Sequence, residues 1–254
     1  MSTLKSSSGF GTAYVPPNST NLKAWYPMYE QTDPLLDRSS NDNDMDVIEG
    51  AAANAQGYGA GRAQYEAAAA NCAFGHSGTI ADLDINDAST NVLISFRANI
   101  AAGAAGNGSV LGKATNSISD GYHVRLGSGY INLLEGDTNI VVSTAHDHND
   151  GVDHHAAIIM DRTGTGNASL YVDSVADGSG LITAVTGDLS TYPFTIGGVG
   201  KSGTVTQNLD GLGVVQQVWD IQVYMTTSAL PSNIVTLAAW LDANEYKALS
   251  TEQW

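Results

Sequence analysis

Short stretches in which apolar and polar residues alternate recur along most of this chain, and glycine-containing segments separate them. Successive side chains of a β-strand point to opposite faces, so a period of two is typical of strands with one buried face. In Asn91–Ile100, for example, Val92, Ile94 and Phe96 fall on one face. The 28 glycines, most of them between the apolar stretches, favour an all-β protein with many turns.

The alternating stretches define the strands that we expect. They are Leu22–Tyr29, Asn91–Ile100, Ser109–Lys113, Gly121–Leu126, Tyr130–Glu135, Asn139–Ser143, Ala156–Asp161, Ala168–Val172, Phe194–Gly197 and Val215–Met225. In the last stretch, Trp219, Ile221, Val223 and Met225 are predicted to form the core face, and Val218 to lie on the opposite face. About ten strands are enough for two antiparallel sheets packed as a sandwich.

The period changes near the end of the chain, where a short helix is predicted over residues 232–243. Ile234, Leu237, Ala238 and Leu241 recur at the spacing of one helix face, and Ser232 can cap the first free N–H groups. We expect this C-terminal helix to pack its apolar stripe on a sheet.

Two further segments do not follow the strand pattern. Residues 1–20, with serines and two prolines, are expected to form an extended N-terminal arm before one domain over residues 21–254. In residues 50–80, alanine favours a helix over Tyr65–Asn71, whereas the glycines favour loops and short edge strands.

The charge of the chain excludes several classes of partner. Asp and Glu number 26 against 10 Lys and Arg, which leaves a net charge of −16 and disfavours nucleic acid and anionic membranes. No apolar run approaches the ~20 residues of a membrane helix, and residues 1–17 do not resemble a Sec signal, so no membrane insertion is expected.

The single cysteine, Cys72, excludes internal disulfides and is expected to be a small buried residue.

The order of several motifs resembles that of the concanavalin A-like jelly rolls of the laminin-G and pentraxin type. Over about residues 20–243, the segments that carry the resemblance are Leu22–Met28, Leu36–Asn43, Ile94–Arg97, Asp150–Ala156, Leu170–Asp173, Thr195–Gly198, Trp219–Tyr224 and Ser228–Leu230. Asp153 stands where this family usually has Trp, and Ser174 where it usually has Gly. The resemblance implies a jelly-roll sandwich with a concave face that binds sugars, protein or calcium in many members.

The acidic segment from residue 37 to residue 46 is a candidate cation site. Asp37, Asn41, Asp42, Asp44 and Asp46 place oxygen donors at short intervals, which suits a hard cation such as Ca²⁺. The segment is not an EF-hand loop, because it lacks the glycine and the final glutamate of that motif. The alternative is a turn in which Asp and Asn side chains bond nearby backbone groups. The sequence therefore suggests calcium as a cofactor.

Histidines gather in residues 146–155. His146 and His148 are two residues apart, so on a strand they share a face and suit Zn²⁺ or Ni²⁺ beside a carboxylate. His154 and His155 fall on a structural motif of the family that the chain resembles. The alternative is therefore a hydrogen-bonded structural or surface role for these histidines.

Motifs of hydrolytic enzymes are absent from the sequence, and no catalytic residue is predicted. Some concanavalin A-like glucanases use a Glu-x-Asp-x-x-Glu strand, which does not occur here, and no Gly-x-Ser-x-Gly elbow occurs either. We interpret Gly127–Gly129 and Gly178–Gly180 as turns, and Gly197–Ser202 as a tight loop that lacks the spacing of a phosphate loop.

These observations favour a non-enzymatic virion protein, such as a capsid decoration, tail or fibre component, that uses a laminin-G-like jelly roll for protein or glycan contacts. Its expected location is the virion, its partners other virion proteins or surface glycans, and its state a homo-oligomer. The alternative is a secreted or cell-surface carbohydrate-binding module. A glycoside hydrolase or lyase is disfavoured by the carboxylate pattern.

Overall fold

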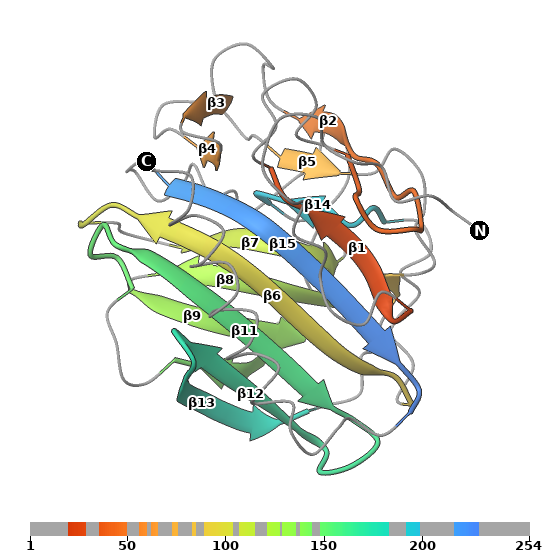
Figure 1. Ribbon diagram of the computed structural model, residues 1–254. Coiled ribbons are helices and arrows are strands. Elements are labelled where there is room, and N and C mark those ends of the chain that lie inside the picture. Colours follow the sequence, from red (N-terminus) through yellow and green to blue (C-terminus); the bar gives the residue numbers. More distant parts are fainter. Residues whose placement is uncertain are drawn as a thin grey trace, which may run out of the picture.

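The computed structural model describes residues 20–28, 36–49, 56–59, 62–65, 73–75, 83–84, 89–103, 107–114, 121–127, 129–135, 138–143, 148–182, 192–198 and 216–228. In this part of the chain, fifteen strands form two sheets that pack face to face (Figure 1). Every strand pairing is antiparallel, so the predicted all-β, two-sheet antiparallel sandwich is confirmed.

The first sheet has eight strands in the order β13-β12-β11-β6-β15-β4-β3, and β1 also pairs with β15. Its strands are β1 (Leu22–Tyr26), β3 (Gln56–Gly59), β4 (Arg62–Tyr65), β6 (Asn91–Ile100), β11 (Asp153–Asp161), β12 (Asn167–Val172), β13 (Val175–Leu181) and β15 (Gln216–Thr226).

The second sheet has seven strands in the order β10-β9-β8-β7-β14-β5-β2. They are β2 (Asp46–Glu49), β5 (Ala73–Gly75), β7 (Asn107–Ala114), β8 (Gly121–Gly127), β9 (Tyr130–Glu135), β10 (Thr138–Val142) and β14 (Thr195–Ile196). Figure 1 shows this sheet behind the first, with β7, β8 and β9 crossing behind β6 and β15.

Several predictions fall partly or wholly outside the described residues. The C-terminal helix over 232–243, the arm over 1–19 and Cys72 all lie there. Of residues 50–80, the described parts form the short strands β3, β4 and β5. No element assigned in the described part is an α-helix, and none of its segments is a candidate membrane-spanning helix.

The core lies between the two sheets, where the predicted alternation places apolar side chains. On β6, Val92, Ile94 and Phe96 are buried in this core. On the opposite face of the same sheet, Leu93 belongs to a smaller apolar cluster that includes Trp25. Both faces of β6 are therefore buried, and the strand packs against apolar side chains on both sides of the first sheet.

A bulge in β15 alters its predicted faces. Asp220 adopts a positive φ of 49°, and the pairing register with β6 shifts between Trp219 and Gln222. A bulge places an extra residue on one strand and rotates its side chains. Val218 therefore joins Trp219 in the core, whereas simple alternation assigned Val218 to the other face.

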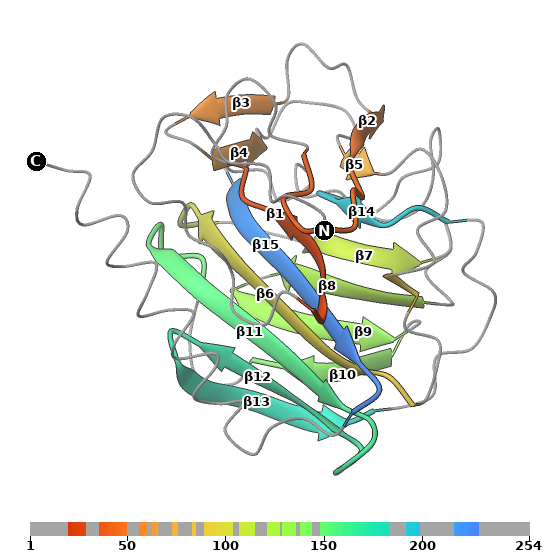
Figure 2. The ribbon, with the colours of Figure 1, turned by 45° about the vertical axis from the view of Figure 1, so that its right-hand side comes forward.

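The prediction that Gly178–Gly180 forms a turn is wrong, because these residues lie within β13. A Cβ atom built on Gly180 would lie 1.7 Å from the carbonyl oxygen of Ile140 on β10. Glycine thus allows the edge strands of the two sheets to approach along one side of the sandwich, where Figure 2 shows β10 and β13 close together.

A buried ion pair links the two sheets beyond the ends of β9 and β11. The guanidinium of Arg162, in the β11–β12 turn, pairs with the carboxylate of Glu135 at the end of β9. Their side chains are only 4% and 2% exposed, so both charges are stabilised by groups of the protein rather than by water.

Candidate functional site

Asp37, the first of the predicted calcium ligands, is buried against β1. Its Oδ1 accepts hydrogen bonds from the backbone N–H groups of Trp25 (2.9 Å) and Ser39 (2.8 Å). Its Oδ2 accepts from Ser39 Oγ (2.7 Å) and from the backbone N–H of Asn43 (3.0 Å). Burial raises the pKa of Asp37, although these hydrogen bonds favour its charged form. The carboxylate therefore holds residues 37–43 against the strand.

The other members of the acidic segment have different surroundings. Asp44 Oδ1 accepts from the backbone N–H of Asp37 at 2.9 Å, and Asn41 Nδ2 donates to the carbonyl of Leu22 at 2.8 Å. Asp42 is exposed with a positive φ of 61°, and Asp46 begins β2 in the second sheet. Among the described residues, no three or more His, Cys, Asp or Glu side chains are grouped to hold a metal ion. These contacts fit the predicted turn, while calcium binding by the segment stays a prediction.

His148 forms a buried link between the sheets at the end of the sandwich where β11 begins. Its Nε2 lies 2.9 Å from Asp177 Oδ2 on β13, and both side chains are almost fully buried. Its backbone N–H donates to the carbonyl of Gly129, before β9, at 2.8 Å. His146, its predicted metal-binding partner, lies outside the described residues.

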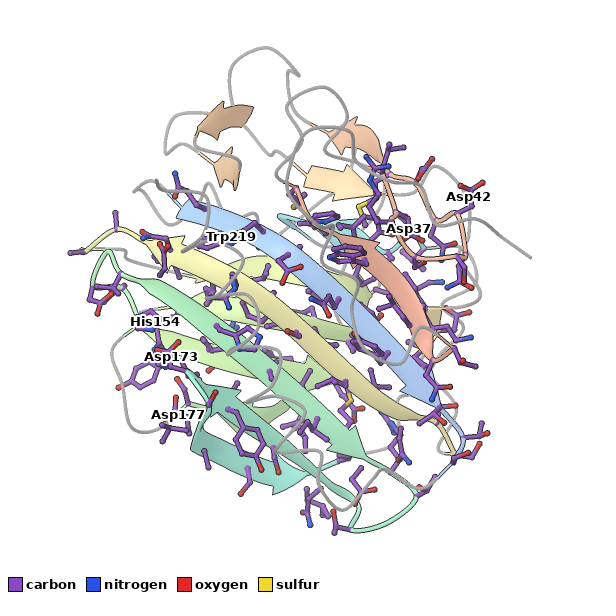
Figure 3. All side chains as sticks on the ribbon, in the orientation of Figure 1. Asp37, Asp42, His154, Asp173, Asp177 and Trp219 are labelled. Carbon is purple, nitrogen blue, oxygen red and sulfur yellow. The ribbon has the colours of Figure 1, made fainter. Side chains whose placement is uncertain are left out.

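His154 lies at the start of β11, close to Asp173 (Figure 3), and contacts two carboxylates. Its Nδ1 is 2.7 Å from Asp173 Oδ2, and its Nε2 is 3.3 Å from Asp150 Oδ1. The ring also contacts that of His148 edge to face, at 5.2 Å between centroids. The hydrogen bond to Asp173 raises the pKa of His154, with a smaller contribution from Asp150.

The pKa values of the two carboxylates shift in the opposite direction, downward. Burial tends to raise the pKa of Asp173, but hydrogen bonds from His154 and from the backbone of His155 lower it overall. The pKa of Asp150 is lowered first by the backbone N–H of Val152 and then by His154. Near neutral pH this arrangement favours a protonated imidazole between two ionised carboxylates.

His155 points away from this exposed group and is buried. Its Nε2 lies 2.8 Å from Ser95 Oγ on β6, and its backbone N–H donates to Asp173 Oδ1 at 2.9 Å. Asp173 and Ser174 have positive φ values of 48° and 66°, which is the geometry of a tight hairpin turn between β12 and β13. Ser174 thus adopts the left-handed conformation for which the resembled family usually has Gly.

Exposed apolar side chains lie near the partners of His154 along the chain. Val152 (55% exposed) follows Asp150, and Val175 (56%) follows the hairpin turn. Tyr130, 46% exposed, follows the glycine whose carbonyl binds the backbone of His148. We call the following set the His154 rim: Tyr130, Asp150, Val152, His154, Asp173 and Val175. It combines hydrogen-bonding and apolar groups on a surface held by backbone pairing.

A second polar network occupies the outer face of the first sheet and is closed to solvent. Trp25 Nε1 donates to Asp220 Oδ1 at 2.8 Å, and Gln222 Nε2 donates to both oxygens of Asp220 at 3.1 Å. Tyr224 Oη donates to Gln222 Oε1 at 3.0 Å. These side chains are buried, so the network fixes β1 on β15 and offers no surface to a ligand.

The sequence pointed to the histidines at this end of the sandwich, but not to the carboxylates that they contact. Asp173 was noted only as part of a strand motif, and Asp177 was not singled out. The pairs His154–Asp173 and His148–Asp177 are 19 and 29 residues apart. Because no local spacing relates them, only the folding of β13 beside β12 brings them together.

No protein-family model and no curated protein matches the sequence. Among solved structures, the binding domain of Paraclostridial Mosquitocidal Protein 1 is similar, with a TM-score of 0.63 and 12% identity over 90% of this chain and 53% of that one. The binding domain of botulinum neurotoxin serotype D has a TM-score of 0.60 and 10% identity over 89% of this chain and 52% of that one. The binding domain of botulinum neurotoxin DC, in complex with rat synaptotagmin II, has a TM-score of 0.56 and 10% identity over 89% of this chain and 52% of that one.

These likenesses define the class of fold, a jelly-roll-like β-sandwich. This chain spans about half the length of the solved chains that it matches. At such low identity the likeness is one of fold alone. The laminin-G type and a bacteriophage origin stay predictions from the sequence.

Proposed function

We propose that this chain is a non-enzymatic binding module that contacts protein or glycan surfaces through the His154 rim. One observation carries the proposal: Val152 and Val175 expose apolar surface two residues from Asp150 and Asp173, the carboxylates that contact His154. Apolar groups next to fixed hydrogen-bonding groups are typical of recognition surfaces. The rim rests on the ends of paired strands, so a partner would meet a surface that is already ordered.

The contacts of the histidines support a role in binding over one in catalysis. Both ring nitrogens of His154 face carboxylates, and His148 and His155 are buried against Asp177 and Ser95. A general base needs a nitrogen within reach of a substrate proton, and a nucleophilic serine must reach its substrate. Ser95 is fully buried, which disfavours nucleophilic attack from this position.

Within this binding role, we propose a virion structural or accessory protein, with other virion proteins or surface glycans as partners. The low content of Lys and Glu, the abundance of Gly, Ala, Thr and Asn, and the serine- and proline-containing residues 1–20 support this assignment. A secreted or cell-surface carbohydrate-binding module is the second candidate. Tyr130 favours it, because an exposed aromatic ring can stack on the face of a sugar ring.

Two measurements separate these candidates. Immunogold electron microscopy of particles with an antibody to this chain should label the particle surface if the chain is a virion component. A glycan array probed with the purified full chain should give strong signals if the second candidate holds. Unlabelled particles together with a positive array would overturn the virion assignment.

A rim variant tests the binding surface itself. Tyr130→Ala combined with Val152→Ser should weaken binding to whichever partner these experiments identify, because both changes remove exposed apolar contacts. Leu181→Ser is the matched control, since Leu181 is also exposed (69%) but lies at the far end of β13 from Val175. Equal binding by the rim variant, the control and the unmodified chain would contradict the proposed surface.

A further inference from the structure

The outer face of the first sheet, which points away from the sandwich core, carries a band of apolar side chains. Tyr224 on β15 lies opposite Leu22 on β1 and Leu93 on β6. Leu93 in turn lies opposite Ile159 on β11, so these side chains form one row across the sheet. We call the following set the outer band: Leu22, Leu93, Ala157, Ile159, Tyr171 and Tyr224. It crosses the neighbouring strands β1, β15, β6, β11 and β12.

The outer band is buried, although it faces away from the core. Apart from the half-buried Tyr171, its members are at most 5% exposed. The outer face of an antiparallel sandwich usually meets water and is polar. Every strand of the described part belongs to one of the two sheets, and Figure 1, which views this face, shows none of these strands in front of β6 and β11. The burial of the outer band therefore requires a further layer on this face.

The C-terminal segment, residues 229–254, leaves the sheet beside the outer band. Ser228 follows Tyr224 by four residues, and Asn91 precedes Leu93 by two. The buried Asn91 Nδ2 donates a hydrogen bond to the carbonyl of Ser228 at 2.9 Å, which fixes the point of exit next to the start of β6. The segment thus begins at the edge of the row that needs a cover.

This segment also carries an apolar stripe of matching length. The stripe of the helix predicted over residues 232–243 consists of Ile234, Leu237, Ala238 and Leu241. A helix of twelve residues is about 18 Å long. Five strands at their usual spacing extend over about 19 Å, so one such helix spans the outer band from β1 to β12.

Residues 1–19 are the other terminal segment that joins the sheet near this row. They enter β1 just before Leu22, but their serines and two prolines are typical of an extended arm and not of an amphipathic helix. The apolar stripe therefore favours the C-terminal segment as the cover.

We propose that residues 229–254 pack across the outer face of the first sheet, with the helix over 232–243 lying on the outer band. The chain's own C-terminal segment would then form a third layer, and a partner could reach this face only after the segment is displaced. The inference is independent of the His154 rim, because His154 lies opposite Ala98, near the other end of β6 from Leu93.

Site-specific photocrosslinking of the full chain tests this placement. The photoreactive amino acid p-benzoylphenylalanine in place of Tyr171 keeps an aromatic ring at the half-buried edge of the outer band. After irradiation, mass spectrometry should find crosslinks from position 171 to residues 232–243 of the same chain. The same amino acid in place of Ala102 is the control, since Ala102 is exposed in the turn after β6, about 30 Å along the strand from Leu93. It should give no crosslink to residues 232–243.

Two aspartate variants in the Tyr171-substituted chain test the apolar stripe. Leu237→Asp should remove most of the crosslink, because an ionised carboxylate is costly to bury against apolar side chains. Ala239→Asp makes the same charge change on the opposite face of the helix and should leave the crosslink in place. Crosslinks from position 171 to residues 1–19, to another segment or to a second copy in place of 232–243, or equal yields from the two variants, would overturn the proposal. Far-UV circular dichroism verifies that each variant is folded.

Discussion

The ion pair between Arg162 and Glu135 is the interaction whose removal has the clearest predicted consequence. Glu135→Ala leaves the guanidinium of Arg162 buried, at 4% exposure, without its carboxylate partner. Breaking a buried pair in this way typically costs about 3–5 kcal/mol, because the remaining charge has lost both water and its counter-charge. Total stabilities of single domains are about 5–15 kcal/mol, so this one substitution should remove a large part of the free energy of unfolding.

Equilibrium unfolding in urea, followed by far-UV circular dichroism, measures this change. Glu135→Ala should lower the midpoint strongly without altering the slope. Replacing both partners by apolar residues, Glu135→Leu with Arg162→Met, should cost less than the sum of the single changes, because neither charge of the pair is then left buried without the other. Asp153→Ala, at an exposed position, is the control and should cost less than about 1 kcal/mol. A loss below about 1 kcal/mol for Glu135→Ala, or strict additivity in the double variant, would refute the reasoning.

Three further predictions concern other parts of the sandwich. Trp219→Ala should cost about 3–5 kcal/mol by cavity formation, because Trp219 is 3% exposed in the core; urea unfolding measures it, and a loss near zero would exclude the core assignment. Gly180→Ala should destabilise the protein by about 1–3 kcal/mol, because its methyl group would overlap the carbonyl of Ile140, whereas Ser179→Ala should be nearly neutral when both are measured by urea unfolding. The raised pKa of His154 means that its contribution to stability is complete below about pH 6.5 and is lost as the pH rises through the higher folded value. Urea midpoints at about pH 6 and pH 8.5 should therefore differ less in His154→Gln than in the unmodified chain, and an unchanged difference would contradict the role of Asp173.

The sequence predicted the long strands well because their side chains alternate between two environments. Asn91–Ile100 and Tyr130–Glu135 were predicted with the bounds that β6 and β9 have, and the core face of β6 was also correct. β13 was missed because glycine carries no side chain, so Gly178 and Gly180 remove the alternation on which a strand is recognised. The bulge at Asp220 was missed for a related reason, since a single positive φ shifts the faces without changing the local pattern.

The candidate site was predicted less completely than the fold. The clustering of His148 and His154 with acidic residues is visible in the sequence, but the carboxylates that bind them, Asp173 and Asp177, follow from hairpin geometry. The hydrogen-bond partners of Asp37 could not be predicted from the sequence either. Its oxygen-rich neighbourhood suggests a cation site, and only the structure identifies the backbone N–H groups that its carboxylate accepts.

The position of β15 between β6, β4 and β1 has a consequence for how the chain is made. β1 pairs with β15, and the hydrogen bond from Trp25 to Asp220 spans 195 residues. During synthesis from the N-terminus, β1 and β6 therefore leave the ribosome long before the strand that joins them, and their edges stay open in the meantime. Contacts between such distant segments slow folding and prolong exposure to aggregation. A chain that stops before β15 would lack the strand that joins β6 to β4 and β1, so β15 governs whether the strands made before it can complete their sheet.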